Sequence, residues 1–256
     1  MKLDASASSD PGKVRSGNED SYFVDVDLGL LVVADGMGGH RSGEVASALA
    51  VRKVSESIAS ASTTEPHETL LDAIASAEEA VVEQSLSSEK DFGMGTTVVM
   101  AFLPQGNALW IAHVGDSRAY LSRDGALELL TEDHTIYNQL RLAGQLTDDP
   151  GMRPPRNMLS QAIGVGMPLS PEIESIELKP GDRIMLCTDG LTDMVNDTEI
   201  ASVLGAAGAP ADACTELVGL ANNYGGADNI TVVVADISGD QPDGKRSSGG
   251  GEEVNA

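Results

Sequence analysis

The sequence has few aromatic residues, few basic residues and only two cysteines. Aromatic side chains make up 3% of the 256 residues, which argues against a platform on which nucleic-acid bases stack. Sixteen Lys and Arg residues stand against forty Asp and Glu residues, a formal net charge of −24. Such a charge repels nucleic-acid backbones and anionic membranes, and it concentrates cations. We therefore expect neither a nucleic acid nor a membrane as a partner, although most of the excess acid serves solubility.

Long apolar runs are also missing. No stretch reaches the roughly 18 apolar residues of a transmembrane helix, and the first residues, Met1–Asp4, lack the apolar centre of a signal peptide. The cysteines, Cys187 and Cys214, form no metal-binding or redox spacing, and Cys187 within an apolar run is expected to be an inert core residue of a reducing compartment. These absences predict a cytoplasmic protein. A hydrophobic fraction of 41% still provides a sizeable core.

One stretch organises the interpretation of the whole chain. Five apolar residues, Leu30–Ala34, run directly into Asp35-Gly36, which predicts a buried strand that ends on a carboxylate. Glycine at this point allows the backbone to turn and brings its carbonyl close to an ion held by the aspartate. A carboxylate beside a main-chain carbonyl suits Mg²⁺ or Mn²⁺. A single pair of this kind is usually only a turn, so the hypothesis depends on recurrence.

The arrangement recurs along the chain. Asp116 and Asp189 also follow buried apolar runs, and Asp228 precedes one. If these strands share sheets, the four acids gather at one edge, where carboxylates repel one another unless cations or raised pKa values relieve the repulsion. Oxygen ligands without His or Cys companions exclude a zinc-type site. That each Asp only caps a turn remains the better explanation for any one of them, but not for all four.

Periodicity predicts the remaining elements. Helices are expected to begin at Ser42 and at Pro66, and to span 197–205, 210–223 and, briefly, 157–163. Strands are expected at 21–26, 95–103, 108–114, 119–121, 127–130, 172–178, 183–187 and 230–237. The polar connection over 131–157 is long enough for a lid or binding loop, and 239–256 has the composition of a disordered tail.

Six motifs identify a resemblance to a known family. They occur in the order seen in the metal-dependent protein phosphatases, and residues 5–238 resemble the bacterial branch of the protein phosphatase 2C type. The motifs are Arg15-x-x-Asn18-Glu19-Asp20, Val33-Ala34-Asp35-Gly36-Met37-Gly38-Gly39-His40, Gly93-Met94-Gly95-Thr96-Thr97, His113-Val114-Gly115-Asp116-Ser117-Arg118, Leu186-Cys187-Thr188-Asp189-Gly190-Leu191 and Gly226-x-Asp228-Asn229-x-Thr231-Val232.

The resemblance implies an α+β fold, a four-layer α-β-β-α sandwich with two central antiparallel sheets between helix pairs. One phosphatase domain would span 1–238, with a flap at about 135–157. By the family pattern Asp35 would bridge two Mn²⁺ or Mg²⁺ ions, and the Gly36 carbonyl would bind one of them. Asp189 and Asp228 would hold the first ion.

The resemblance also implies residues for the second ion and for a third one. Glu19 and Asp20 would act on the second ion largely through its waters, and Asp116 with Asp189 would form a third, weaker site. Two ions sharing a water lower its pKa and leave a hydroxide in line with phosphorus. The implied reaction is hydrolysis of phosphoserine and phosphothreonine in proteins that a serine/threonine kinase has modified, by a monomeric enzyme.

Two further roles concern the substrate. The planar fork of Arg15 suits two phosphoryl oxygens, although a solvated loop salt bridge is the plainer interpretation of that residue alone. Eukaryotic relatives place a histidine directly after the Asp-Gly pair, where this chain has Met37. His40 is therefore the nearest candidate for the general acid that protonates the leaving oxygen. A role in holding a metal-bound water is an equal alternative for His40. Arg153 and Arg156 in the flap could hold an anionic phosphopeptide. Bacterial members of the family often carry a His-Pro pair before an Arg-Asn step in the flap, where this chain has Arg153-Pro154-Pro155-Arg156-Asn157. This difference leaves the substrate preference open.

Two non-catalytic interpretations remain open from the sequence. The first is a pseudophosphatase that binds a partner, although no metal ligand of the family pattern is missing. The second is an acidic cation-binding protein without catalysis. Within the enzyme class, a phosphatase that acts on a free regulator also remains open.

Overall fold

The computed structural model describes residues 1–38, 42–62 and 65–239. The strands are β1 (Lys2–Asp10), β2 (Asp20–Asp25), β3 (Leu30–Met37), β4 (Gly95–Thr96), β5 (Val98–Phe102), β6 (Ala108–Val114), β7 (Arg118–Arg123), β8 (Ala126–Leu129), β9 (Glu172–Glu177), β10 (Arg183–Cys187) and β11 (Ile230–Ser238). The helices are α1 (Ser42–Ala59), α2 (Pro66–Ser87), α3 (Ile136–Leu142), α4 (Asp189–Thr192), α5 (Asp197–Ala206) and α6 (Pro210–Asn223), with a 3₁₀ turn at Pro150–Met152.

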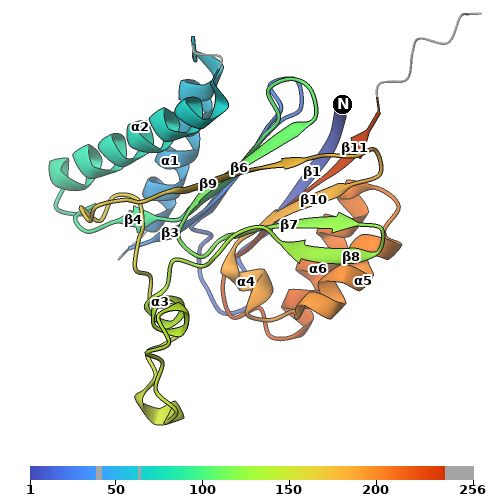
Figure 1. The fold of residues 1–256 in the computed structure, drawn as a ribbon. Helices are drawn as coiled ribbons and strands as arrows, with labels where there is room; N and C mark the ends of the chain where they lie inside the picture. The colour runs from blue at the N-terminus through green and yellow to red at the C-terminus, as the bar shows by residue number, and fades with distance from the viewer. Residues whose placement is uncertain (39–41, 63–64, 240–256) are drawn as a thin grey trace, which may run out of the picture.

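Two antiparallel sheets form the centre of the molecule. One has the strand order β1-β11-β10-β7-β8, and the other has the order β2-β3-β5-β6-β9 with the short β4 paired to β3. Helices α1 and α2 lie on the outer side of the second sheet, and α5 and α6 lie on the outer side of the first (Figure 1). The predicted four-layer sandwich is confirmed.

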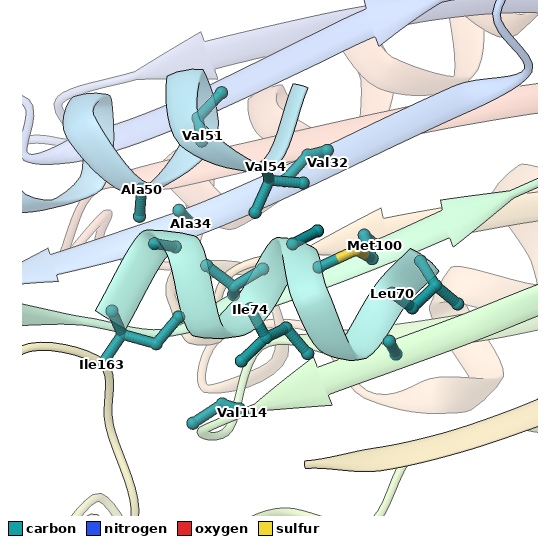
Figure 2. Packing of buried hydrophobic residues seen from close by; sticks show 14 of the residues in the cluster. Val32, Ala34, Ala50, Val51, Val54, Leu70, Ile74, Met100, Val114 and Ile163 are labelled. Atoms are coloured by element: carbon teal, nitrogen blue, oxygen red, sulfur yellow. The ribbon is translucent and has the colours of Figure 1, made fainter. Parts of the chain in front are cut away.

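The apolar runs are continuous because both faces of each sheet are covered. In β3, Leu30 and Val32 pack toward α1 and α2, whereas Leu31 and Val33 pack into the layer between the sheets. Figure 2 shows the helix side of this packing, where Val32 lies among side chains of both helices. Each such side chain contributes roughly 1.5–3 kcal/mol by burial, so the strands are held rigidly on both faces.

Local sequence features explain where several helices begin and where one hairpin turns. Pro66 occupies the first turn of α2, where its missing N–H costs nothing. Asn196 and Glu199 form a reciprocal capping box at the start of α5. Asp124-Gly125 forms the hairpin turn that joins β7 to β8, with positive φ at both residues, as a type I′ turn requires.

Three parts of the local prediction were incomplete or wrong. Strand β1 was not predicted, although all nine of its residues pair with β11. The helix expected over 157–163 is absent, and the backbone there makes isolated bridges from Leu159 to Thr135 and from Ile163 to Thr96. The expected strand 95–103 is divided at Thr97 into β4 and β5.

The predicted flap follows β8 and projects from the body of the molecule with α3 and the 3₁₀ turn (Figure 1). Two predictions concern residues outside the described ranges: the role of His40, and the disordered tail beyond Gly239. Among the described helices none is long and apolar enough to cross a membrane.

Candidate active site

Acidic side chains from both sheets line one cavity of about 200 Å³. The antiparallel arrangement explains this gathering, because the end of β10 and the start of β11 lie together. Several of the residues predicted from the sequence share this cavity: Arg15, Glu19, Asp35, Gly36, Asp116, Asp189 and Asp228. The wall also contains residues to which the sequence patterns gave no role, among them Thr97, Asn157, Leu159 and Asn229.

Asp20 lies at the same end of the sheets but does not line this cavity. It pairs across the sheet with Asp35, and its Oδ2 accepts a hydrogen bond of 2.9 Å from the Thr188 hydroxyl of the other sheet. Its Oδ1 is buried and has no hydrogen-bond partner among the described residues. A buried carboxylate oxygen without a donor is an expected feature of a site that takes a cation or its water.

The glycines after the aspartates have a different purpose from the one expected. Gly36 does not turn the chain, because β3 continues through it to Met37. A Cβ at position 36 would lie 2.1 Å from the Gly43 carbonyl oxygen, and one at Gly190 would lie 1.9 Å from the Asn229 carbonyl oxygen. In both Asp-Gly pairs glycine allows two backbone segments to touch beside the carboxylate.

Hydroxyl groups hold the backbone of Asp35. Its amide donates to the Thr97 hydroxyl oxygen at 2.9 Å, and its carbonyl accepts from the Thr96 hydroxyl at 2.8 Å. The Thr97 hydroxyl also bonds the Ser117 hydroxyl at 2.7 Å, beside Asp116. Thr96-Thr97 and Asp116-Ser117 both lie in the sequence motifs. The sequence indicates that these hydroxyl groups support the acids only by placing small hydroxyl residues in those motifs.

The electrostatics of this cluster oppose ionisation. Burial raises the pKa of Asp20 to about 7, of Asp116 to about 8 and of Asp189 to about 6, and neighbouring carboxylates add to each shift. Burial and the same neighbours hold the pKa of Asp35 well above its usual range. Four acids with raised pKa values in one place are destabilised as anions, and divalent cations would remove that penalty.

The donor set fits hard divalent ions. The candidate ligands are carboxylate oxygens and the Gly36 carbonyl, without a His or Cys among the described residues of the cavity wall, which suits Mg²⁺ or Mn²⁺ and not zinc. The orphaned Oδ1 of Asp20 fits the same reading. A pair of divalent metal ions could thus be held by Asp35, the Gly36 carbonyl, Asp189 and Asp228.

A second group of possible ligands has unsuitable geometry. Atoms of His113, His134 and Glu172 lie within 4.8 Å of one another. The two imidazole rings stack at 4.5 Å between centroids with only 21° between their planes, so their in-plane lone pairs do not converge on one ion. His113 Nε2 lies 2.9 Å from the Glu132 carbonyl oxygen, so this buried imidazole has a polar partner within the protein.

Arg15 reaches the acidic cluster from the loop between β1 and β2. Its Nη2 donates to Asp228 Oδ2 at 2.6 Å, and its side chain remains 53% exposed. The hydrogen bond to Asp228 raises the pKa of Arg15, so the guanidinium is a permanent cation at the rim of a cavity of carboxylates. A charged fork in this position is available to an anion entering from solvent.

The flap adds a second, adjoining cavity of about 410 Å³. Asp116, Asn157 and Asp189 line both cavities. Arg156 lines the second one, with its guanidinium carbon 4.9 Å from the centroid of the Tyr137 ring. The structure thus brings Arg156 toward the site.

Arg153 is arranged differently. Its Nε donates to the Thr147 carbonyl at 2.9 Å within the flap, and it lines neither of these two cavities. The two flap arginines that the sequence treated alike therefore differ in position.

Comparison with known proteins identifies the family of this chain. Residues 13–219 match the family model described as protein phosphatase 2C. The chain belongs to the protein phosphatase 2C family. It is 38% identical over 235 residues to the serine/threonine phosphatase stp of Listeria monocytogenes, which covers 89% of this chain and 93% of that protein.

Solved structures agree with this assignment. The crystal structure of the Mycobacterium tuberculosis serine/threonine phosphatase PstP/Ppp superposes with a TM-score of 0.85 at 37% identity, over 93% of this chain and all of that one. A second structure, the PstP catalytic domain with two manganese ions, has a TM-score of 0.83 at 36% identity, over 93% of this chain and 99% of that one. The chain is a metal-dependent serine/threonine protein phosphatase.

Proposed function

We propose that this phosphatase hydrolyses phosphoserine and phosphothreonine monoesters in proteins with Mn²⁺ or Mg²⁺ held by Asp35, the Gly36 carbonyl, Asp189 and Asp228. The observation that carries the proposal is the cavity in which these groups meet and in which burial opposes the ionisation of Asp35 and Asp189. The two manganese ions of the PstP catalytic domain support the choice of metal.

The chain's own residues would prepare the phosphoryl group for attack. When bound, two divalent ions would lower the pKa of a shared water toward neutrality and supply the hydroxide nucleophile. Arg15 would orient the phosphoryl oxygens, since its planar fork matches two of them. Glu19 and Asp20, at the same end of the sheets, would accept hydrogen bonds from water around the second ion. His40 remains our candidate for protonating the leaving oxygen.

A third, weaker ion would lie between Asp116 and Asp189, which are shared by the two adjoining cavities. Substrate residues next to the phosphorylated one would occupy the larger cavity. In this position Arg156 could pair with an acidic group of the substrate, whereas Arg153 would stabilise the flap through its bond to Thr147.

Several broader predictions belong to the same proposal. We expect one catalytic domain over residues 1–238, a monomer, and kinase-phosphorylated proteins as substrates. A cytoplasmic location is consistent with the two free, buried cysteines. Burial raises the pKa of Cys187 to about 12, which keeps its thiol unreactive.

A direct assay separates this proposal from the non-catalytic alternatives. The wild-type protein should release phosphate from a phosphothreonine peptide in Mn²⁺, and chelator should stop the release. Asp35→Asn should show no measurable turnover, while the same change at the exposed Asp72 of α2 should leave turnover unchanged. Metal binding without turnover in the wild type would favour a pseudophosphatase, and an active Asp35→Asn would contradict the ligand assignment.

A further inference from the structure

We propose that Asn229 is a positioning residue that fastens the loop carrying Arg15 and Glu19 to the metal end of the sheets. Its side chain is buried at 5% exposure. Its Nδ2 donates to the carbonyl oxygens of Pro11, at 3.0 Å, and Gly17, at 2.8 Å, while its Oδ1 accepts from the Glu19 amide at 2.8 Å. The inference rests on the proposed function of this site.

These three bonds connect both ends of one loop. Pro11 begins the segment between β1 and β2, and Gly17 and Glu19 end it, so one carboxamide closes the segment into a ring with Arg15 near its middle. The amide uses both of its N–H groups and its oxygen on this loop. Because the loop has no strand or helix of its own, these bonds largely determine where Arg15 lies.

The same residue is joined to the metal ligand beside it. The backbone amide of Asn229 donates to Asp228 Oδ1 at 2.8 Å, while Asp228 Oδ2 accepts from Arg15 at 2.6 Å. A second backbone bond, from Lys13 to the Gly226 carbonyl at 2.8 Å, holds the loop against the same segment. The position of Arg15, the proposed phosphate-binding residue, relative to Asp228, the proposed metal ligand, is therefore set through residues 226–229.

Only asparagine fits this position among residues of its shape. An aspartate is isosteric but has no N–H to donate, so its second oxygen would face two carbonyl oxygens. Loss of both donors removes the bonds that the Pro11 and Gly17 carbonyls accept from the buried Asn229 side chain. Asn229→Asp thus releases the loop with little change in volume, and Asn229→Ala releases it without adding a charge.

The test compares these variants with a matched control. Asn107→Asp makes the same substitution in the hairpin between β5 and β6, where the Asn107 amide bonds Glu177 away from the site. With saturating Mn²⁺, both Asn229 variants should raise KM for a phosphothreonine peptide roughly tenfold, the loss of one charge-assisted contact. In an Arg15→Ala background the same Asn229 substitutions should alter KM less than about twofold, because the guanidinium that Asn229 positions is already absent.

Amide hydrogen exchange provides a readout that does not depend on turnover. Exchange within residues 11–19 should be faster in Asn229→Asp than in the wild type and unchanged in Asn107→Asp. If the wild type cleaves no phosphopeptide, the proposed function fails, and exchange alone decides whether Asn229 fastens the loop. Unchanged exchange, equal KM effects in both backgrounds, or Asn229 variants that fail to fold would each overturn the inference.

Discussion

Removing one carboxylate from the active site should stabilise the metal-free protein. Asp116 is suited to this test because it is only 9% exposed and burial raises its pKa to about 8. In chelator the folded protein must either keep a proton on Asp116 or place a charge beside Asp189 and Asp133. Asp116→Asn keeps the shape and removes the charge, so the penalty disappears.

The pKa shift gives the size and sign of the effect. The folded-state pKa is raised, so between the ordinary value of 3.8 and about 8 the folded protein binds a proton that the unfolded chain releases. Stability conferred by this proton is lost as the pH rises. At about 1.4 kcal/mol per pH unit, Asn in place of Asp116 should gain about 2 kcal/mol at pH 5 and about 5 kcal/mol at pH 8. The second figure is an upper value, because the folded protein relaxes around a charge.

Urea unfolding in chelator, followed by fluorescence of the single tryptophan Trp110, measures this difference. The matched control is Asp72→Asn on the exposed side of α2, which removes the same charge from the surface and reports general repulsion at a net charge of −24. Saturating Mn²⁺ at pH 8 should stabilise the wild type more than Asp116→Asn. A gain that does not change between pH 5 and pH 8, or that Asp72→Asn reproduces, would refute the reasoning.

Four further substitutions test other contacts of the site. Arg15→Ala should raise KM for a phosphopeptide at least tenfold, because a charge-assisted contact to the phosphoryl oxygens is lost. An unchanged KM would contradict the phosphate-binding role of Arg15. Gly43→Ala should lower the melting temperature and the turnover, because its Cβ would lie 2.7 Å from the Gly36 carbonyl oxygen at a cost of about 1–3 kcal/mol. Arg156→Ala should raise KM for a peptide but not for p-nitrophenyl phosphate, whereas Arg153→Ala should change neither KM, and equal effects would contradict their separation.

The position of the acids could be predicted because it depends on strand direction alone. Asp189 follows one buried run and Asp228 precedes another, and in an antiparallel pair these two points lie at the same end of the sheet. The same logic places Asp20 at the start of β2 opposite Asp35 near the end of β3. Four acids at such points are therefore evidence for one site, where any single acid is not.

Strand β1 could not be predicted because its pattern is set by its neighbours. Its residues are mostly small, with Leu3, Ala5 and Ala7 only partly buried between the sheets. Helix α6 covers the other face, where Cys214 Sγ bonds the Ser6 carbonyl at 3.3 Å, and small residues permit that approach. A strand of Ser and Ala has little intrinsic β-propensity, so it forms because the edge of β11 is available.

The short helix expected after the flap failed for a related reason. Residues 157–163 have apolar spacing that suits a helical turn, but their backbone groups pair with Thr96, His134 and Ile136 instead. The Ile163 amide bonds the Thr96 carbonyl, and Ser160 bonds the His134 carbonyl. Tertiary pairing of the backbone overrides local periodicity in so short a segment.

The polar contacts that make the site work are the part that a single sequence conceals. Asn229 and Gly17 are separated by 212 positions, and Thr188 reaches Asp20 across 168, so no local pattern announces either bond. The acids themselves are placed by burial, which also opposes their ionisation. The polar contacts therefore have to hold the carboxylates together against their own repulsion. An ion that binds only the folded state stabilises it by an amount that grows with the logarithm of the ion concentration divided by its Kd. If Asp35 and Asp189 hold the ions as proposed, metal binding and folding are coupled, because burial opposes the ionisation of both carboxylates.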